Sequence, residues 1–182
     1  MSPVSLAVLL AALLAAGLLG YTYYTSTVSG AERRVTVATL ERLADMLASG
    51  GASLPGGLRL EAYNATLRID GIPIGVRLAR ITLPGCHGVR VDPARYGAAL
   101  APWGNGTACG LASTIRVAER GGVVVVEYYT PSTTGLYGSL NVTSSRVRLT
   151  VWATSISTPW GNVSLGRPVE VVVLERVVGG GP

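Results

Sequence analysis

Hydrophobic and polar residues change their pattern twice along this chain. Val4 to Tyr24 is uncharged and mostly apolar, and no charged residue appears before Glu32. From Ala31 to Ser49 the apolar positions recur at helical spacing, and beyond Ala52 short runs of Val, Ile, Leu, Tyr and Thr are separated by Gly and Pro. About twenty apolar residues can cross a hydrocarbon core of about 30 Å as a helix. The pattern therefore predicts an apolar helix, an amphipathic helix and a β-rich region, in that order.

The segment 31–49 extends the apolar helix as an amphipathic one. Apolar or small residues share one predicted face, and charged residues lie opposite. The first set is Val35, Thr39, Leu43, Met46 and Leu47, and the second is Arg34, Glu41 and Asp45. Gly50-Gly51 is a typical helix end. Residues 1–49 are thus predicted to form one rod, about 70 Å long at about 1.5 Å per residue. Residues 1–30 are its hydrophobic part and 31–49 its amphipathic extension.

Residues 50–182 are predicted to form a β-rich globular head. The expected strands are Leu58–Ile69, Ile72–Leu83, Leu111–Glu119, Val123–Thr130, at least one within Leu136–Ile156, and Val169–Val178. Asp70-Gly71 and Gly121-Gly122 mark turns, and 84–109 is expected to be a loop. In the fifth run Val147, Leu149 and Val151 share one predicted face, with Arg146, Arg148 and Thr150 on the other. The predicted fold class is α+β: a long N-terminal α-helix followed by an antiparallel β-sandwich-like or Greek-key head.

The N-terminal residues carry a family resemblance. Met1-Ser2-Pro3-Val4, then Leu6 to Leu10 and the small-residue run Ala11–Gly20, resemble the mature N-terminus of an archaeal type IV pilin. In that family a prepilin peptidase removes a short basic leader, which agrees with the lack of Lys and Arg before Arg33. Met1 is then expected to be a processed N-terminus, the alternative being an ordinary initiator. Ser5 stands where bacterial type IV pilins carry a glutamate, which favours the archaeal branch.

The resemblance implies a homopolymer that forms an extracellular filament at the cell surface, with a role in adhesion. The subunit would be embedded in the membrane before assembly, and its partners would be the pilus assembly machinery and the prepilin peptidase. The implied filament-core residues are Met1, Ser2, Pro3, Val4, Leu6, Leu9, Leu10, Leu13, Leu14, Leu18 and Leu19. Alanines and glycines between these leucines let helices approach closely. Two alternatives stay open: a membrane-anchored surface domain that does not polymerise, such as a minor pilin or an accessory protein of the pilus or archaellum, and a module that binds DNA or another polyanion.

Every asparagine of the chain begins an N-glycosylation sequon. The sequons are Asn64-Ala65-Thr66, Asn105-Gly106-Thr107, Asn141-Val142-Thr143 and Asn162-Val163-Ser164. None has proline at its middle position, so each is a possible acceptor. The alternative is a chance neighbourhood of Asn with Ser or Thr. N-linked glycans are therefore expected, no cofactor is expected, and the head is expected outside the cell.

Cys86 and Cys109 are the only cysteines, and both lie in the predicted loop region. A disulfide between them would tie down the loop and contribute about 3 kcal/mol by the chain-entropy treatment. The alternative is a pair of free thiols. With His87 as the only histidine, a metal site lacks ligands. We therefore predict the disulfide and no metal site.

The formal charge of the chain is +5. Residues 1–49 contribute nothing to it, because Arg33, Arg34 and Arg42 balance Glu32, Glu41 and Asp45. The excess lies in the head, where six of the twelve arginines look like solvent-facing strand residues: Arg59, Arg68, Arg77, Arg116, Arg146 and Arg148. Nucleic acid is therefore not the expected partner, although arginines clustered on one face would favour a polyanion binder. With one histidine, no Gly-rich phosphate loop and no metal-ligand cluster in the sequence, an enzyme is not expected.

Overall fold

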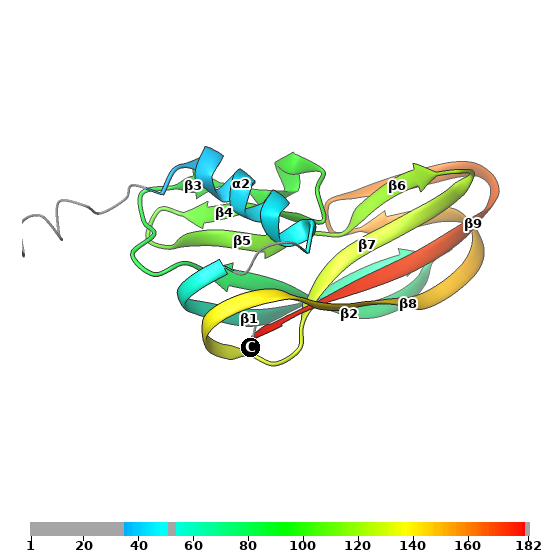
Figure 1. Ribbon diagram of the computed structural model, residues 1–182. Helices are drawn as coiled ribbons and strands as arrows, with labels where there is room; N and C mark the ends of the chain where they lie inside the picture. Colours follow the sequence, from blue (N-terminus) through cyan, green and yellow to red (C-terminus); the bar gives the residue numbers. More distant parts are fainter. Residues whose placement is uncertain (1–34, 51–53, 181–182) are drawn as a thin grey trace, which may run out of the picture. The chain divides into compact units, whose positions relative to one another are not determined.

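The structure, a computed structural model, describes residues 35–50 and 54–180, which belong to a compact unit beginning at Val35 (Figure 1). These residues form one α-helix, one short 3-10 helix and a nine-stranded sheet. The elements are α2 (Val37–Ala48), β1 (Leu54–Ile69), β2 (Ile72–Thr82), β3 (Arg90–Val91), η1 (Pro93–Tyr96), β4 (Leu100–Asn105), β5 (Cys109–Ser113), β6 (Arg116–Arg120), β7 (Val123–Pro131), β8 (Gly135–Thr158) and β9 (Gly161–Gly180). The strand order is β3-β4-β5-β2-β1-β8-β9-β7-β6.

Helix α2 has its own start and is not the second half of a rod. Thr36 has extended backbone angles, φ −98° and ψ 161°, and its side chain accepts a hydrogen bond from the amide of Thr39. This N-cap satisfies an amide that a continuous helix would bond to a preceding turn. The prediction of one rod through residue 49 is therefore wrong.

The buried face of α2 also differs from the predicted one. Leu40, Ala44 and Leu47 are buried, whereas Thr39 is exposed and Met46 is 47 % exposed. Helical spacing is compatible with two neighbouring rows of apolar residues on α2. Packing of the helix against β4 and β5 buries the row that contains Leu40.

The sheet is mixed, so the predicted antiparallel sandwich-like head is also corrected. The pairs β1–β2 and β8–β9 are antiparallel hairpins, but β7 runs parallel to β9 from Val124↔Val171 to Pro131↔Val178. Strand β8 begins close to the end of β7, and β9 returns in the direction of β7 (Figure 1). Alternation of apolar residues is the same in parallel and antiparallel strands, so the sequence did not reveal this topology.

Strand boundaries follow the sequence closely in some places and not in others. The Asp70-Gly71 turn joins β1 to β2 as predicted, with φ of 48° at Asp70. The run 111–119 is not one strand, because β5 ends at Ser113 and β6 starts at Arg116 in a different part of the sheet. The predicted loop 84–109 contains β3, η1 and β4.

Two apolar clusters form the core. The first joins α2 to β1, β2, β4 and β5, with Leu40, Leu60 and Leu111 among its members. The second lies where the β1–β2 hairpin packs on β7, β8 and β9, and includes Leu67 and Val173. Strand β1 serves both clusters, because it is long enough to continue from one to the other.

Asp70 ties the tip of the β1–β2 hairpin to β8. Its Oδ1 accepts hydrogen bonds from the amides of Thr154 at 2.9 Å and Ser155 at 2.8 Å, and both side-chain hydroxyls donate to the same oxygen. These bonds, above all the one from the Thr154 amide, lower the pKa of Asp70. The link between the hairpin tip and β8 is therefore stronger when Asp70 is ionised.

Candidate functional site

The structure joins Cys86 and Cys109 in a disulfide, in agreement with the pairing expected from the sequence. Their Cα atoms are 5.2 Å apart and both residues are buried. Cys86 follows β2 and Cys109 opens β5, so the bond encloses β3, η1 and β4. The disulfide thereby closes the segment that carries β3 and β4, the strands at one edge of the sheet.

The sequon asparagines differ in accessibility. Asn64, Asn105 and Asn162 are exposed. Asn141 is half-buried in β8, and its Oδ1 is shut off from solvent without a hydrogen-bond partner. A glycosyltransferase must reach the side-chain amide, so the structure favours the first three as acceptors and disfavours Asn141. Glycosylation itself stays a prediction.

His87 is exposed in the turn that follows Cys86. Within residues 35–50 and 54–180, no three His, Cys, Asp or Glu side chains gather as metal ligands would.

An arginine-lined cleft is formed by residues from four strands of the sheet. It has a volume of about 700 Å³ and is bounded by β2, the end of β7, β8 and β9. Its polar lining side chains are Arg77, Thr130, Ser132, Ser144, Arg146, Arg148 and Glu175. Three arginines and one glutamate therefore line the cleft, which gives its lining a positive net charge.

Hydrogen bonds hold two of the arginine side chains that line the cleft. The Glu175 side chain is buried and accepts a hydrogen bond from Nε of Arg146 at 2.8 Å. Arg148 donates from Nη1 to the Tyr128 hydroxyl at 2.8 Å and from Nη2 to the Gly75 carbonyl at 3.0 Å. Burial is the main reason that the pKa of Tyr128 is raised, so this hydroxyl is neutral at pH 7.

Arg148 and Arg77 have no carboxylate partner in the described part of the chain. The ion pairs found there join Arg59 to Glu61, Arg146 to Glu175 and Arg176 to Glu127. Arg148 is instead fixed by two neutral oxygens. Two positive charges of the cleft are therefore available to an anion.

The alternation of residues along the strands predicts that these arginines are exposed, but it does not indicate that three of them line one cleft. Arg59, Arg68, Arg77, Arg146 and Arg148 are exposed as predicted, whereas Arg116 is half-buried. The predicted face of Val147, Leu149 and Val151 is interrupted, because a register shift lies between Val147 and Leu149. Such a bulge changes which residues point to each side of the sheet. Val147 is consequently 59 % exposed, while Val151 packs on the second apolar cluster.

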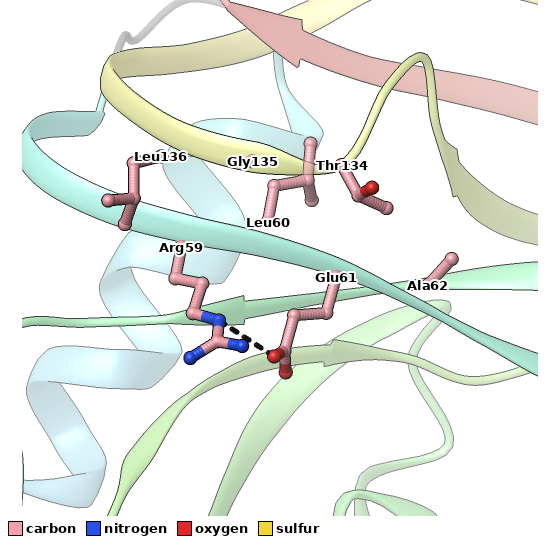
Figure 2. A pocket seen from close by; sticks show the side chains of 7 residues that line it. All are labelled: Arg59, Leu60, Glu61, Ala62, Thr134, Gly135 and Leu136. Atoms are coloured by element: carbon pink, nitrogen blue, oxygen red, sulfur yellow. Dashed lines mark ion pairs between the residues drawn. The ribbon is translucent and has the colours of Figure 1, made fainter.

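A second hollow, of about 540 Å³, lies between β1 and the start of β8. Figure 2 shows Arg59 and Glu61 on the same side of β1, where they form an ion pair of 2.8 Å. Leu136 on the opposite rim is 77 % exposed. Among the described residues that line this hollow, the charges of Arg59 and Glu61 neutralise each other. The hollow is therefore less suited to binding an anion than the arginine-lined cleft.

Arg80 is another arginine whose role the sequence did not suggest. Its guanidinium lies 5.0 Å from the ring centre of Tyr63 and 4.9 Å from that of Trp103. Burial raises the pKa of Tyr63 to about 12, although the charge of Arg80 lowers it in part. This stack joins β1, β2 and β4, and we interpret it as structural, because cation–π contacts stabilise such packing.

The predicted filament-core residues, from Met1 to Leu19, lie outside the described residues. Among the described helices, none has the length and apolar character needed to span a membrane.

Comparison of the chain with protein-family models, curated proteins and solved structures found no match.

Proposed function

We propose that the chain is a structural subunit of an extracellular archaeal type IV pilus and that the filament serves in surface adhesion. The observation that carries this proposal is the N-terminal sequence. A Ser2-Pro3-Val4 start leads into an uncharged apolar segment ending at Tyr24. Identical subunits would assemble through this segment, since a bundle of Leu and Ala side chains replaces lipid contacts at little cost.

The chemistry of the folded domain supports a location outside the cell. A buried disulfide persists in oxidising surroundings, and exposed sequon asparagines are accessible to glycosylation. Both features suit a domain displayed on a filament.

The exposed apolar side chains of β8 support contact with a neighbouring subunit. Trp152 is 68 % exposed and Val147 is 59 % exposed on the same strand. Large apolar groups left in water favour association when a partner can cover them. In a filament the partner would be an adjacent copy of the domain.

Electron microscopy of filaments sheared from the source cells, with N-terminal sequencing of the purified protein, tests the proposal. Filaments built from a chain that starts at Met1 are expected. Protein found only in detergent-extracted membranes, with no filament, would refute the polymer and favour a membrane-anchored domain.

Trp152→Gln tests the lateral contact, with Met46→Gln as a matched control. Met46 is also an exposed apolar residue, but it lies on α2. Trp152→Gln should reduce the number or length of filaments without lowering the melting temperature of the domain. If both variants lose filaments to the same extent, or if neither variant loses any, a contact through Trp152 is contradicted.

A further inference from the structure

The arginine-lined cleft has the features of a binding site rather than of ordinary surface charge. Arg146 is held by the buried carboxylate of Glu175, and Arg148 is held by the Tyr128 hydroxyl and the Gly75 carbonyl. Fixed side chains lose little conformational freedom on binding, so a site preorganised in this way binds more tightly. The volume of about 700 Å³ lies within the range of small-molecule sites.

Arginine is well suited to carboxylates, because its planar guanidinium can donate two parallel hydrogen bonds to both oxygens. Arg77 and Arg148 have no acidic partner among the described residues, as the ion pairs above show. Thr130, Ser132 and Ser144 line the same cleft. Their hydroxyls can donate to and accept from the hydroxyl groups of a sugar.

We propose that this cleft binds an acidic sugar of the uronic-acid type, with Arg77 and Arg148 contacting the sugar carboxylate. The hydroxyl-bearing residues would bind the ring hydroxyls. The inference deepens the adhesive role proposed above by giving the filament a ligand class, an acidic polysaccharide. It depends on the folded domain and can be tested without filaments.

The lining of the cleft favours an acidic sugar over a nucleic acid. Proteins that bind single-stranded nucleic acid stack its bases on aromatic rings, and the described residues that line this cleft include no aromatic side chain. Tyr128 reaches it through the hydroxyl that Arg148 binds, while the residue itself is fully buried in the second apolar cluster.

The test is calorimetric titration of the full-length chain in mild detergent with trigalacturonate at about 0.15 M salt, where long-range attraction is screened. Maltotriose serves as the neutral sugar, and inorganic phosphate and a short DNA oligonucleotide serve as other anions. Arg77→Gln and Arg148→Gln are compared with Arg120→Gln, which removes the same charge from an exposed residue of β6 outside the cleft.

Trigalacturonate should bind and maltotriose should not. Arg77→Gln and Arg148→Gln should each weaken trigalacturonate binding about tenfold or more, since a charge-assisted hydrogen bond is lost. Arg120→Gln should leave it unchanged. Arg77→Gln keeps the test valid if Arg148→Gln unfolds the domain, because Arg77 is exposed on β2.

No binding of trigalacturonate, or equal weakening by all three substitutions, would overturn the proposal. Equally tight binding of phosphate or DNA would overturn the acidic-sugar specificity. Filaments without sugar binding would leave the pilus proposal standing and refute the inference about the cleft, so the two failures are distinguishable.

Discussion

Removal of the disulfide between Cys86 and Cys109 is predicted to destabilise the domain substantially. The two residues are separated by 23 positions in the chain. A crosslink over a loop of this size lowers the entropy of the unfolded chain, which corresponds to about 3.4 kcal/mol of stability at about 25 °C. For a domain of this length the melting temperature should fall by about 7 to 14 °C. Lost packing adds to this value, because both side chains are buried.

The loss can be assigned to the crosslink by comparing single and double variants. Cys86→Ala, Cys109→Ala and the double variant all lack the bond, so each should lose about the same crosslink contribution. The costs of the single variants should therefore be strongly non-additive. Urea unfolding followed by tryptophan fluorescence measures them, and Trp103, which pairs with Gly110 next to Cys109, lies close to the change. Additive single-variant costs, or a loss below about 1 kcal/mol in the double variant, would refute the crosslink argument.

Two further predictions concern charged groups. Because the folded-state pKa of Asp70 is lowered, its carboxylate stabilises the fold above the unfolded-state pKa of about 3.9, and this contribution is lost as the pH falls through the folded-state value. Asp70→Asn should therefore lower the melting temperature at pH 7, and the difference from wild type should shrink in strong acid; a constant difference would contradict this. Glu127→Gln should cost about 3 kcal/mol in urea unfolding, because it leaves the partly buried Arg176 without its partner. Adding Arg176→Met should recover part of that loss, and a further additive loss would contradict the ion-pair explanation.

The ion pair of Glu127 with Arg176 also links the sheet to the helix. Nε of Arg176 lies 2.5 Å from Oε1 of Glu127, although outside hydrogen-bonding geometry. Its Nη1 donates to the carbonyl of Ala48 at the end of α2 at 3.1 Å. One charged side chain on β9 therefore contacts both β7 and the helix, which neither the helix pattern nor the strand pattern indicated.

Local features of the head could be predicted from sequence because they depend on neighbouring residues. Asp70-Gly71 marks its turn through the positive φ that Asp and Gly tolerate. Alternating apolar residues located most of β1, β2 and β7. The paired cysteines were predictable because the chain offers a single pairing.

The start of α2 was harder to predict. The helical pattern extends upstream of Val37, and only the cap at Thr36 shows where the helix begins. Apolar periodicity reports which residues can share a face, but it does not identify where hydrogen bonding stops.

The sequence by itself determined the apolar N-terminal segment, the β-rich character of the head, its main turns and the chemistry available at its surface. Tertiary structure alone decided the parallel pairing of β7 with β9, the bulge after Val147 and the arginine-lined cleft. The physical reason is the distance along the chain between the residues that interact. Turns and alternation arise from steric preferences over a few residues, whereas the cleft brings together Arg77, Arg148 and Glu175 from β2, β8 and β9. Their proximity depends on how long strands pair and pack, which no local pattern encodes.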